Sequence, residues 1–304
     1  MQRWEAQSGL GRYIALALLV LASVACVALG ISIAQIFAGI PTTWQIDGAL
    51  FWRVVAFVLL LGLTGALFYR TAAAFTLHYA IDRNGLYIFW LGNRAVIPLD
   101  QITRIDPGAA TRPLPLGPLQ MIGYYWGHTT LMSGERLHLF ATRPPARSLI
   151  VVTDKGAYAI TPADADRFVE DIEQRRNLGA TRVVETGIEQ SRVLFYEFWN
   201  DRAVRGALAL GLILNLALLG LITLRYPALA AEIPLRFDAI GDTVALRPRY
   251  QILFIPLAAL GLLLFNLLVG LAIYRREPFA TRVLQVASVC LQILFGVSLV
   301  ALLG

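Results

Sequence analysis

Side chains with reactive chemistry are few in this sequence, and their spacing favours no catalytic centre. Ser148 lacks the Gly-x-Ser-x-Gly turn that exposes a nucleophile in hydrolases. The three histidines, at positions 78, 128 and 138, are not spaced with cysteines or carboxylates as metal ligands are. The chain has no phosphate-binding loop or dinucleotide fingerprint. We therefore expect no enzymatic activity, no metal site and no cofactor.

Acidic side chains recur in one short segment, as Asp164, Asp166, Glu170, Asp171 and Glu173. Paired carboxylates can perform acid–base catalysis. Here, however, apolar residues such as Phe168 and Ile172 alternate with them at helical spacing, so the acids form the solvated face of an amphipathic helix. We predict this helix over residues 162–177, with Thr161 as N-cap, Pro162 at the first helical position and Gly179 ending it.

Four amide side chains interrupt long apolar runs, namely Asn215, Asn266, Gln285 and Gln292. Unpaired polar groups are costly in lipid, so we expect each amide to face another helix. They then serve either as interhelical hydrogen bonds or as the lining of a substrate pathway. No Asp, Glu or Lys lies deep in these runs, which weakens the second interpretation.

Five apolar runs are long enough to cross a membrane as helices, at residues 13–40, 49–69, 203–224, 252–274 and 283–303. The first exceeds the roughly 7–15 apolar residues of a cleaved signal peptide, so we expect it to be retained. Arginines flank mainly one side of the predicted spans. This bias predicts a multi-pass protein of the bacterial cytoplasmic (inner) membrane, with its N-terminus inside and its C-terminus outside.

The segment between the second and third spans is close to neutral. From Arg70 to Arg202 it carries 15 basic and 14 acidic side chains, whereas the whole chain has a net charge of +6. A nucleic-acid-binding domain would carry a basic stripe. We therefore expect the lipid bilayer and protein partners or self-association, and no nucleic acid.

Alternating strands separated by turns dominate this segment, and the helix at 162–177 follows them. Strands are predicted at 75–81, 86–91, 95–99 and 136–142, followed by a hairpin of 148–153 with 157–161 across a turn containing Gly156. We predict an α+β barrel capped by one C-terminal helix.

Its motifs resemble the bacterial PH-like domain family: Tyr79-x-Ile81-x-x-x-Gly85-Leu86-x-Ile88 and Asp154-x-Gly156-x-Tyr158-x-Ile160-Thr161-Pro162. The resemblance implies a binding or scaffold module. Eukaryotic PH domains hold inositol phosphates with several cations around the first hairpin loop. Here that loop has only Arg83, beside Asp82, which argues against phosphoinositide binding.

An apolar stretch within the segment is the candidate contact surface: Leu119, Met121, Ile122, Tyr124, Tyr125 and Trp126. Tyr and Trp favour membrane interfaces and protein contacts. The stretch forms either a docking patch for a partner or the membrane surface, or part of the barrel core and a strand edge.

The C-terminal half resembles the membrane domain of Sdp-type immunity and signalling proteins, through Ile233-Pro234-x-Arg236-Phe237 and Gly241 in the loop at 225–249. Arg236 stands where that family usually has His. The loop is expected outside the membrane, folded as a turn by Gly241, either as a ligand-sensing loop or as a structural cap. Before the third span, residues 188–199 are predicted to form an interfacial helix.

These observations predict four parts. A two-helix hairpin spans 1–70, a cytoplasmic PH-like domain 71–180, an interfacial amphipathic linker 181–202, and a three-helix membrane domain 203–304. We expect a non-catalytic integral membrane protein that presents its PH-like domain for protein binding, scaffolding or envelope signalling, including service as an accessory subunit of a larger complex. The alternative is a transporter or toxin-immunity-like protein whose C-terminal spans carry the function. It predicts a polar cavity lined by Asn215, Asn266 and Gln292.

Overall fold

The computed structural model describes residues 1–108, 123–179, 181–182, 184, 187–189, 197–237 and 243–303. The chain forms two compact units. The first contains residues 1–25 and 61–195, and the second contains residues 26–60 and 196–304.

Among the described residues, five helices are long and apolar enough to cross a membrane. They are α1 (Leu10–Ile36), α2 (Gly48–Thr76), α4 (Arg202–Arg225), α5 (Phe254–Ile273) and α6 (Pro278–Leu303). This confirms the five apolar helices predicted from the sequence. Helix α2 continues beyond the predicted end at residue 69, so the first predicted strand begins at His78 rather than at residue 75.

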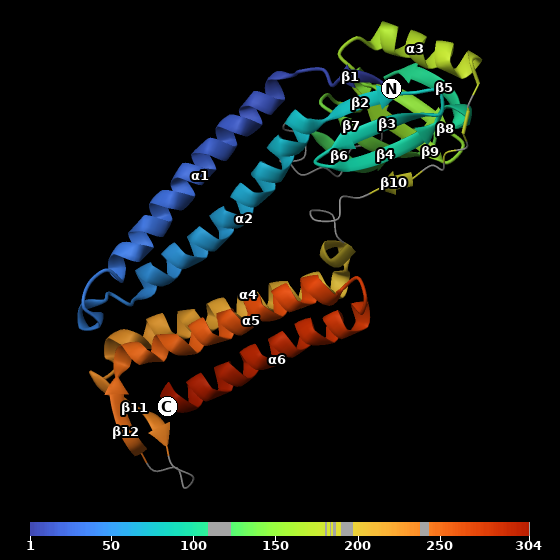
Figure 1. The fold of residues 1–304 in the computed structure, drawn as a ribbon. Helices are drawn as coiled ribbons and strands as arrows, with labels where there is room; N and C mark the ends of the chain where they lie inside the picture. The colour runs from blue at the N-terminus through green and yellow to red at the C-terminus, as the bar shows by residue number, and fades with distance from the viewer. Residues whose placement is uncertain are drawn as a thin grey trace. The chain divides into compact units, whose positions relative to one another are not determined.

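The first unit contains two five-stranded sheets (Figure 1). One sheet has the order β1 (Gln2–Glu5), β2 (His78–Ile81), β3 (Gly85–Trp90), β4 (Asn93–Pro98) and β10 (Gly187–Glu189), with every neighbouring pair antiparallel. The Asp82 carboxylate fixes the β2–β3 turn, because it accepts hydrogen bonds from the N–H groups of Asn84 and Gly85. Short polar side chains favour turns for this reason.

The second sheet has the order β5 (Ile102–Pro107), β8 (Leu149–Thr153), β9 (Gly156–Ile160), β7 (Arg136–Ala141) and β6 (Tyr125–Thr130). Its β7–β9 pair is parallel and the others are antiparallel. A buried apolar core joins residues of both sheets with helix α3 (Ala165–Asn177), including Ile88, Ile97, Val151, Ile160 and Phe168. The two sheets and α3 are called the sheet domain below.

The prediction of a barrel is wrong, because the two sheets remain separate. In the first sheet, β1 pairs along the outer edge of β2 and β10 pairs along the outer edge of β4. These added strands use the backbone groups through which β2 and β4 would have to pair to close a barrel. Both come from segments outside the predicted strands.

Helix α3 begins later than predicted, because its N-cap is Asp164 and not Thr161. The Asp164 carboxylate accepts a hydrogen bond from the backbone N–H of Arg167 at 3.2 Å. The Thr161 hydroxyl instead accepts a hydrogen bond from the N–H of Thr142, and the Thr161 N–H donates to the hydroxyl of Tyr79. Thr161 therefore forms its hydrogen bonds within the core of the domain and does not cap α3. Gly179 follows the helix with φ +73°, as a glycine that ends a helix does.

The linker after α3 begins as a strand, so the predicted interfacial helix at 188–199 is wrong at its start. Residues Gly187–Glu189 form β10 against β4. A single 3₁₀ turn follows at Glu197–Asn200, and residues 190–196 lie outside the described part of the chain.

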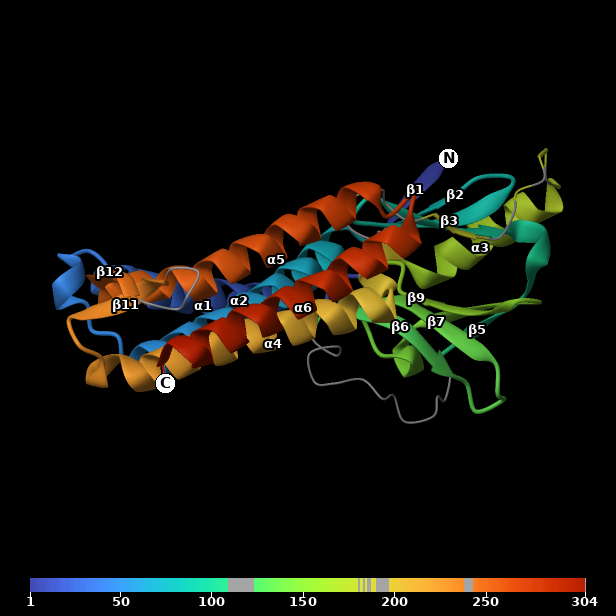
Figure 2. The same cartoon turned by 90° about the horizontal axis from the view of Figure 1, so that it is seen from below.

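In the second unit, α6 packs along both α4 and α5, and the three helices lie side by side in Figures 1 and 2. Between α4 and α5, strands β11 (Glu232–Phe237) and β12 (Thr243–Pro248) form an antiparallel hairpin. Gly241, which was predicted to form the turn, lies outside the described residues. A buried cluster within this unit joins the α2 residue Leu50 to residues such as Leu218, Ile222 and Ile252.

Candidate functional site

The predicted docking patch is only partly described, and its central residue is buried. Leu119, Met121 and Ile122 lie outside the described residues. Tyr124 is 0% exposed, so its assignment to an exposed patch is wrong. Trp126, by contrast, is 39% exposed, and Tyr125 is half-buried.

Tyr124 is buried because the ends of α1 and α2 pack around it. The Arg70 guanidinium donates a hydrogen bond of 2.5 Å to the Tyr124 carbonyl. The neighbouring Tyr69 ring packs edge-on against Trp126, with ring centroids 6.0 Å apart. Gly123, at φ +74°, lies so close to the start of α1 that a Cβ there would be 2.6 Å from the Gly11 carbonyl oxygen. The segment is therefore a junction that holds the sheet domain on its helices.

The buried phenols near this junction are unsuited to proton transfer at neutral pH. Burial raises the pKa of Tyr79 to about 12, although hydrogen bonds with Thr161 oppose the rise. Burial also raises the pKa of Tyr124 well above its ordinary value. Both side chains therefore stay protonated, whereas a general base needs a pKa near the working pH.

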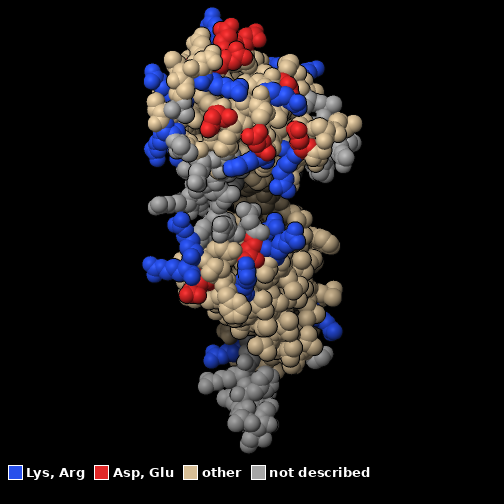
Figure 3. Space-filling view, turned by 90° about the vertical axis from the view of Figure 1, so that its right-hand side faces the viewer, with Lys and Arg blue, Asp and Glu red and all other residues tan. Residues whose placement is uncertain are grey.

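A polar groove of about 460 Å³ crosses one end of the second sheet. The residues that line it come from β5, from the turns β6–β7 and β8–β9 and from the adjoining strand ends: Thr103, Arg104, Glu135, Arg136, Val152, Thr153, Asp154, Lys155 and Gly156. Three are cations and two are anions. Figure 3 shows charges of both signs dispersed over the sheet domain, whereas the helices are mostly uncharged. Such a surface suits a polar or charged protein segment.

Sequence reasoning missed this groove, because the strand β5 that carries Thr103 and Arg104 was not predicted. Pairing of β5 with β8 brings these residues beside the β8–β9 turn, about 50 positions later in the chain. The turn itself, with Lys155 and Gly156, was predicted correctly.

Two histidines that are ten positions apart lie directly opposite each other on β6 and β7. His128 pairs in register with His138, whose ring stacks on Tyr158 at 5.3 Å between centroids. Burial, the Arg136 cation and His128 together lower the pKa of His138. Within the described residues, no group of three or more His, Cys, Asp and Glu side chains could hold a metal ion.

The four amides of the apolar helices are all buried and all bond between helices. The Asn215 amide on α4 donates to the Pro256 carbonyl at 2.9 Å and to the Gln292 carbonyl oxygen at 3.3 Å. Gln292 on α6 donates in turn to the backbone carbonyl of Ala259 at 2.8 Å. One set of hydrogen bonds thus connects α4, α5 and α6.

The other two amides connect the C-terminal half of α5 with the N-terminal half of α6. Asn266 donates to the Ser288 hydroxyl at 2.9 Å. Gln285 donates to the Asn266 backbone carbonyl at 2.8 Å. Hydrogen bonds of this kind fix the packing of helices in a membrane.

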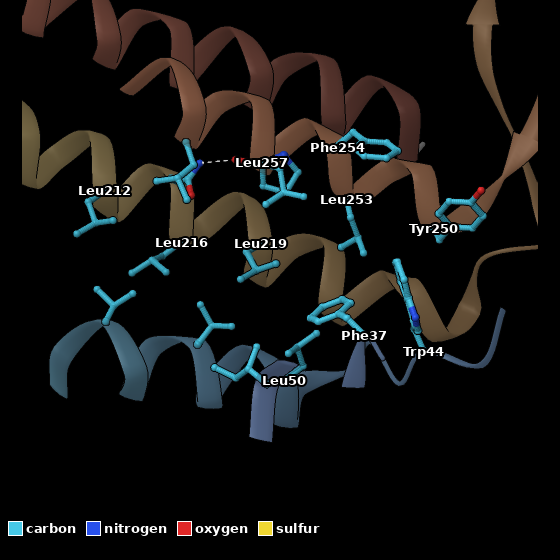
Figure 4. A pocket seen from close by; sticks show the side chains of 16 residues that line it. Phe37, Trp44, Leu50, Leu212, Leu216, Leu219, Tyr250, Leu253, Phe254 and Leu257 are labelled. Carbon is cyan, nitrogen blue, oxygen red and sulfur yellow. Dashed lines mark hydrogen bonds between the residues drawn. The ribbon is translucent and has the colours of Figure 1, made fainter. Parts of the chain in front are cut away.

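An apolar cavity of about 610 Å³ lies between the end of α1, the beginning of α2 and the helices α4 and α5 (Figure 4). Apolar side chains form nearly all of its lining, including Ile33, Phe37, Leu50, Val54, Val58, Leu212, Leu216, Leu219, Leu253, Phe254, Leu257 and Leu260. Asn215 contributes a carboxamide, and Trp44 and Tyr250 contribute rings with a polar edge. Asn266 and Gln292 are not among the lining residues, so the three amides do not line this cavity together.

The sheet domain matches a known protein family. Residues 77–176 match the family model of the bacterial PH domain. This match confirms the resemblance seen in the motifs around Gly85 and Gly156, and it covers about a third of the chain. A bacterial PH domain suggests a non-catalytic binding module. No curated protein and no solved structure matches this chain.

Proposed function

We propose that this protein is a non-catalytic integral membrane protein that presents its PH domain for protein binding, as a scaffold, in envelope signalling or as an accessory subunit of a larger complex. The observation that carries the proposal is the direct attachment of the domain to its helices. Helix α2 ends two residues before β2, and Arg70 on its last turns bonds to the Tyr124 carbonyl. A domain held this way offers a pre-organised surface, which lowers the entropic cost of binding.

We propose the polar groove as the surface that meets the partner. Its cations Arg136 and Lys155 are exposed, and Arg104 forms an ion pair with Asp106 at 2.9 Å while its side chain remains 58% exposed. Exposed charges on a rigid sheet end favour selective association with a complementary surface. The partner is a protein segment that brings carboxylates to these cations.

Photo-cross-linking in native membranes tests this proposal. A photoreactive amino acid at Lys155 should give a discrete cross-linked product, whereas the same group at Arg167 on α3, whose side chain is 79% exposed, should not. Arg136→Glu should reduce the yield from position 155 at least several-fold. Equal products from both positions, or no product from position 155, would overturn the proposal.

We also propose that the protein lies in the bacterial cytoplasmic membrane, with the PH domain and N-terminus inside and the C-terminus outside. The arginine bias around the spans supports this orientation. The test uses single cysteines at Asp154 and Glu232 in a chain without Cys26 and Cys290. In intact cells a membrane-impermeant thiol reagent should label position 232 only, and labelling of position 154 would reverse the orientation.

The alternative, a transporter or a toxin-immunity-like protein of the Sdp type, gains no support from the amide geometry. That function predicts a polar cavity around Asn215, Asn266 and Gln292. Instead, these amides hydrogen-bond to carbonyl or hydroxyl groups of neighbouring helices. The interpretation of the amides as bonds between helices is therefore the one we propose.

A further inference from the structure

The apolar cavity is walled by rows of side chains on separate helices. Leu50, Val54 and Val58 form one row on α2, and Leu212, Leu216 and Leu219 form another on α4. The α2 row alone extends for about 12 Å at the helical rise of 1.5 Å per residue. An elongated apolar space of about 610 Å³ falls within the size range of ligand sites in proteins.

One wall of this cavity, formed by α4 and α5, is fixed by polar bonds between helices. Asn215 fixes α4 to the carbonyl of Pro256 on α5, and Gln292 fixes α6 to Ala259 on α5. Leu50 and Leu253 on opposite walls are already buried, at 1% and 7% exposure. The α4–α5 wall of the cavity therefore cannot shift without breaking buried hydrogen bonds, which is costly in an apolar environment.

Water is a poor occupant of this cavity. A buried water molecule needs two to four polar partners. The Asn215 amide nitrogen already donates to Pro256 and Gln292, and the Trp44 indole N–H donates to the Gly39 carbonyl. An apolar occupant leaves the hydrogen bonds of these two donors intact.

One end of the cavity has the features of a membrane–water interface. Trp44 packs edge-on against Phe37 at 5.0 Å and against Tyr250 at 5.8 Å between ring centroids. Figure 4 shows Trp44 and Tyr250 together at this end and Leu212 at the other. Trp and Tyr favour the headgroup region of a bilayer. Arg249, next to Tyr250 in the chain, donates to the Leu229 carbonyl at 3.2 Å, and its guanidinium lies 4.8 Å from the Tyr226 ring centroid.

We infer that the cavity holds one hydrocarbon chain of a membrane phospholipid, with the headgroup at the Trp44–Tyr250 end. The inference rests on the membrane location that we propose for the protein. Lipid tails already surround the helices, so entry of a chain brings no hydrophobic gain and its retention depends on close packing with the walls.

Native mass spectrometry of the full-length protein after extensive detergent washing tests the inference. The wild-type chain should retain about one phospholipid, whereas loosely bound surface lipid is lost. Leu216→Trp fills the cavity and should reduce retention at least fivefold. The matched control Leu210→Trp, on the same helix at a position that is 47% exposed, should retain the lipid.

A second variant distinguishes loss of lipid by filling of the cavity from loss of lipid by misfolding. Leu260→Trp fills the same space from α5, where Leu260 lines the cavity and is half-buried. Both filling variants are compared with wild type by circular dichroism and gel filtration. If wild type retains no lipid, or if folded filling variants retain as much as Leu210→Trp, the inference is wrong. The groove variant Arg136→Glu should retain lipid like wild type, which separates this test from that of partner binding.

Discussion

The guanidinium of Arg70 donates a hydrogen bond to the backbone carbonyl of Tyr124, 54 positions later in the chain. The bond joins the last turns of α2 to the residue that precedes β6. It also explains why a stretch of Tyr and Trp that looks like a surface patch is partly internal. The helix that leads to the PH domain covers the middle of that stretch.

Replacing Arg70 should loosen the PH domain from α2. Arg70→Met keeps much of the apolar stem and removes the donor to the Tyr124 carbonyl. We expect a loss of about 1–3 kcal/mol in local stability, as for a buried acceptor left without its partner. Limited proteolysis and hydrogen exchange at β6 measure it. Arg53→Met, at an exposed position earlier on the same helix, is the control, and equal β6 exchange in both variants would contradict the prediction.

The N-terminal residues should stabilise the PH domain, because Trp4 packs on α3. Its ring meets Phe168 edge-on at 5.5 Å, and its indole N–H donates to the Asp171 carboxylate at 3.1 Å. Trp4→Ala should lower the free energy of unfolding by about 2–4 kcal/mol, less than for a fully buried tryptophan. Trp4→Phe should lose only about 1 kcal/mol, because the ring contact remains. Thermal unfolding of the full chain distinguishes them, and two equal losses would show that the ring contact is unimportant.

Protonation of Asp201 in acid should lower the stability of the second unit. Its carboxylate caps α4 and accepts hydrogen bonds from Arg282 at 2.7 Å and Tyr274 at 3.0 Å. Burial alone would raise the pKa of Asp201, but the hydrogen bonds from Arg282, Tyr274 and the N–H groups of Val204 and Ala203 outweigh it and lower the pKa. The stabilisation is therefore complete above the ordinary aspartate pKa of about 3.9 and is lost as pH falls toward the lower folded-state pKa.

Asp201→Asn should cost about 1–3 kcal/mol at neutral pH, since it removes a charged acceptor. The difference in melting temperature between wild type and Asp201→Asn should shrink below about pH 4. Asp164→Asn is the matched control, because Asn is as good an N-cap and the Asp164–Arg167 pair is exposed. If the difference in melting temperature between wild type and Asp201→Asn stays constant down to pH 3, the charge of Asp201 does not stabilise the bundle.

Gly270 should be required for the contact between α5 and α6. A Cβ at this position would lie 2.5 Å from the Gln285 amide nitrogen and 3.2 Å from Thr281. Gly270→Ala should therefore destabilise the bundle by about 1–3 kcal/mol through overpacking. Gly261→Ala on the same helix, where a Cβ would meet nothing within 4 Å, should be neutral or stabilising by up to about 1 kcal/mol. Thermal unfolding in detergent compares the two, and similar losses would exclude a special role for Gly270.

Much of the fold follows from local patterns in the sequence. The five apolar helices depend on length and composition alone, and the structure contains all five. The helix around Phe168 and the hairpin at Gly156 depend on periodicity and turn residues over about a dozen positions. The motifs shared with the bacterial PH domain lie in these same stretches.

Other features depend on residues that are far apart in the chain. Strand β1 pairs with β2, more than 70 positions later, and its Trp4 hydrogen-bonds to Asp171, 167 positions away. Strands β5 and β10 have no sequence signal that we recognised. The pairing of β1 and β10 along the edges of the first sheet leaves the two sheets separate instead of forming the predicted barrel. The N-cap of α3 is Asp164 rather than the predicted Thr161, because the Thr161 hydroxyl is already bonded within the core of the domain.

The sequence alone therefore determined the apolar helices and the class of the domain between them, because those properties are carried by neighbouring residues. Only the tertiary structure decided that Tyr124 is internal, that Arg104 and Lys155 share a groove, and that α2 and α4 enclose an apolar cavity. Each of these depends on which distant surfaces pack together. Side-chain shape and hydrogen bonding across the fold select that packing, and no short stretch of sequence contains it.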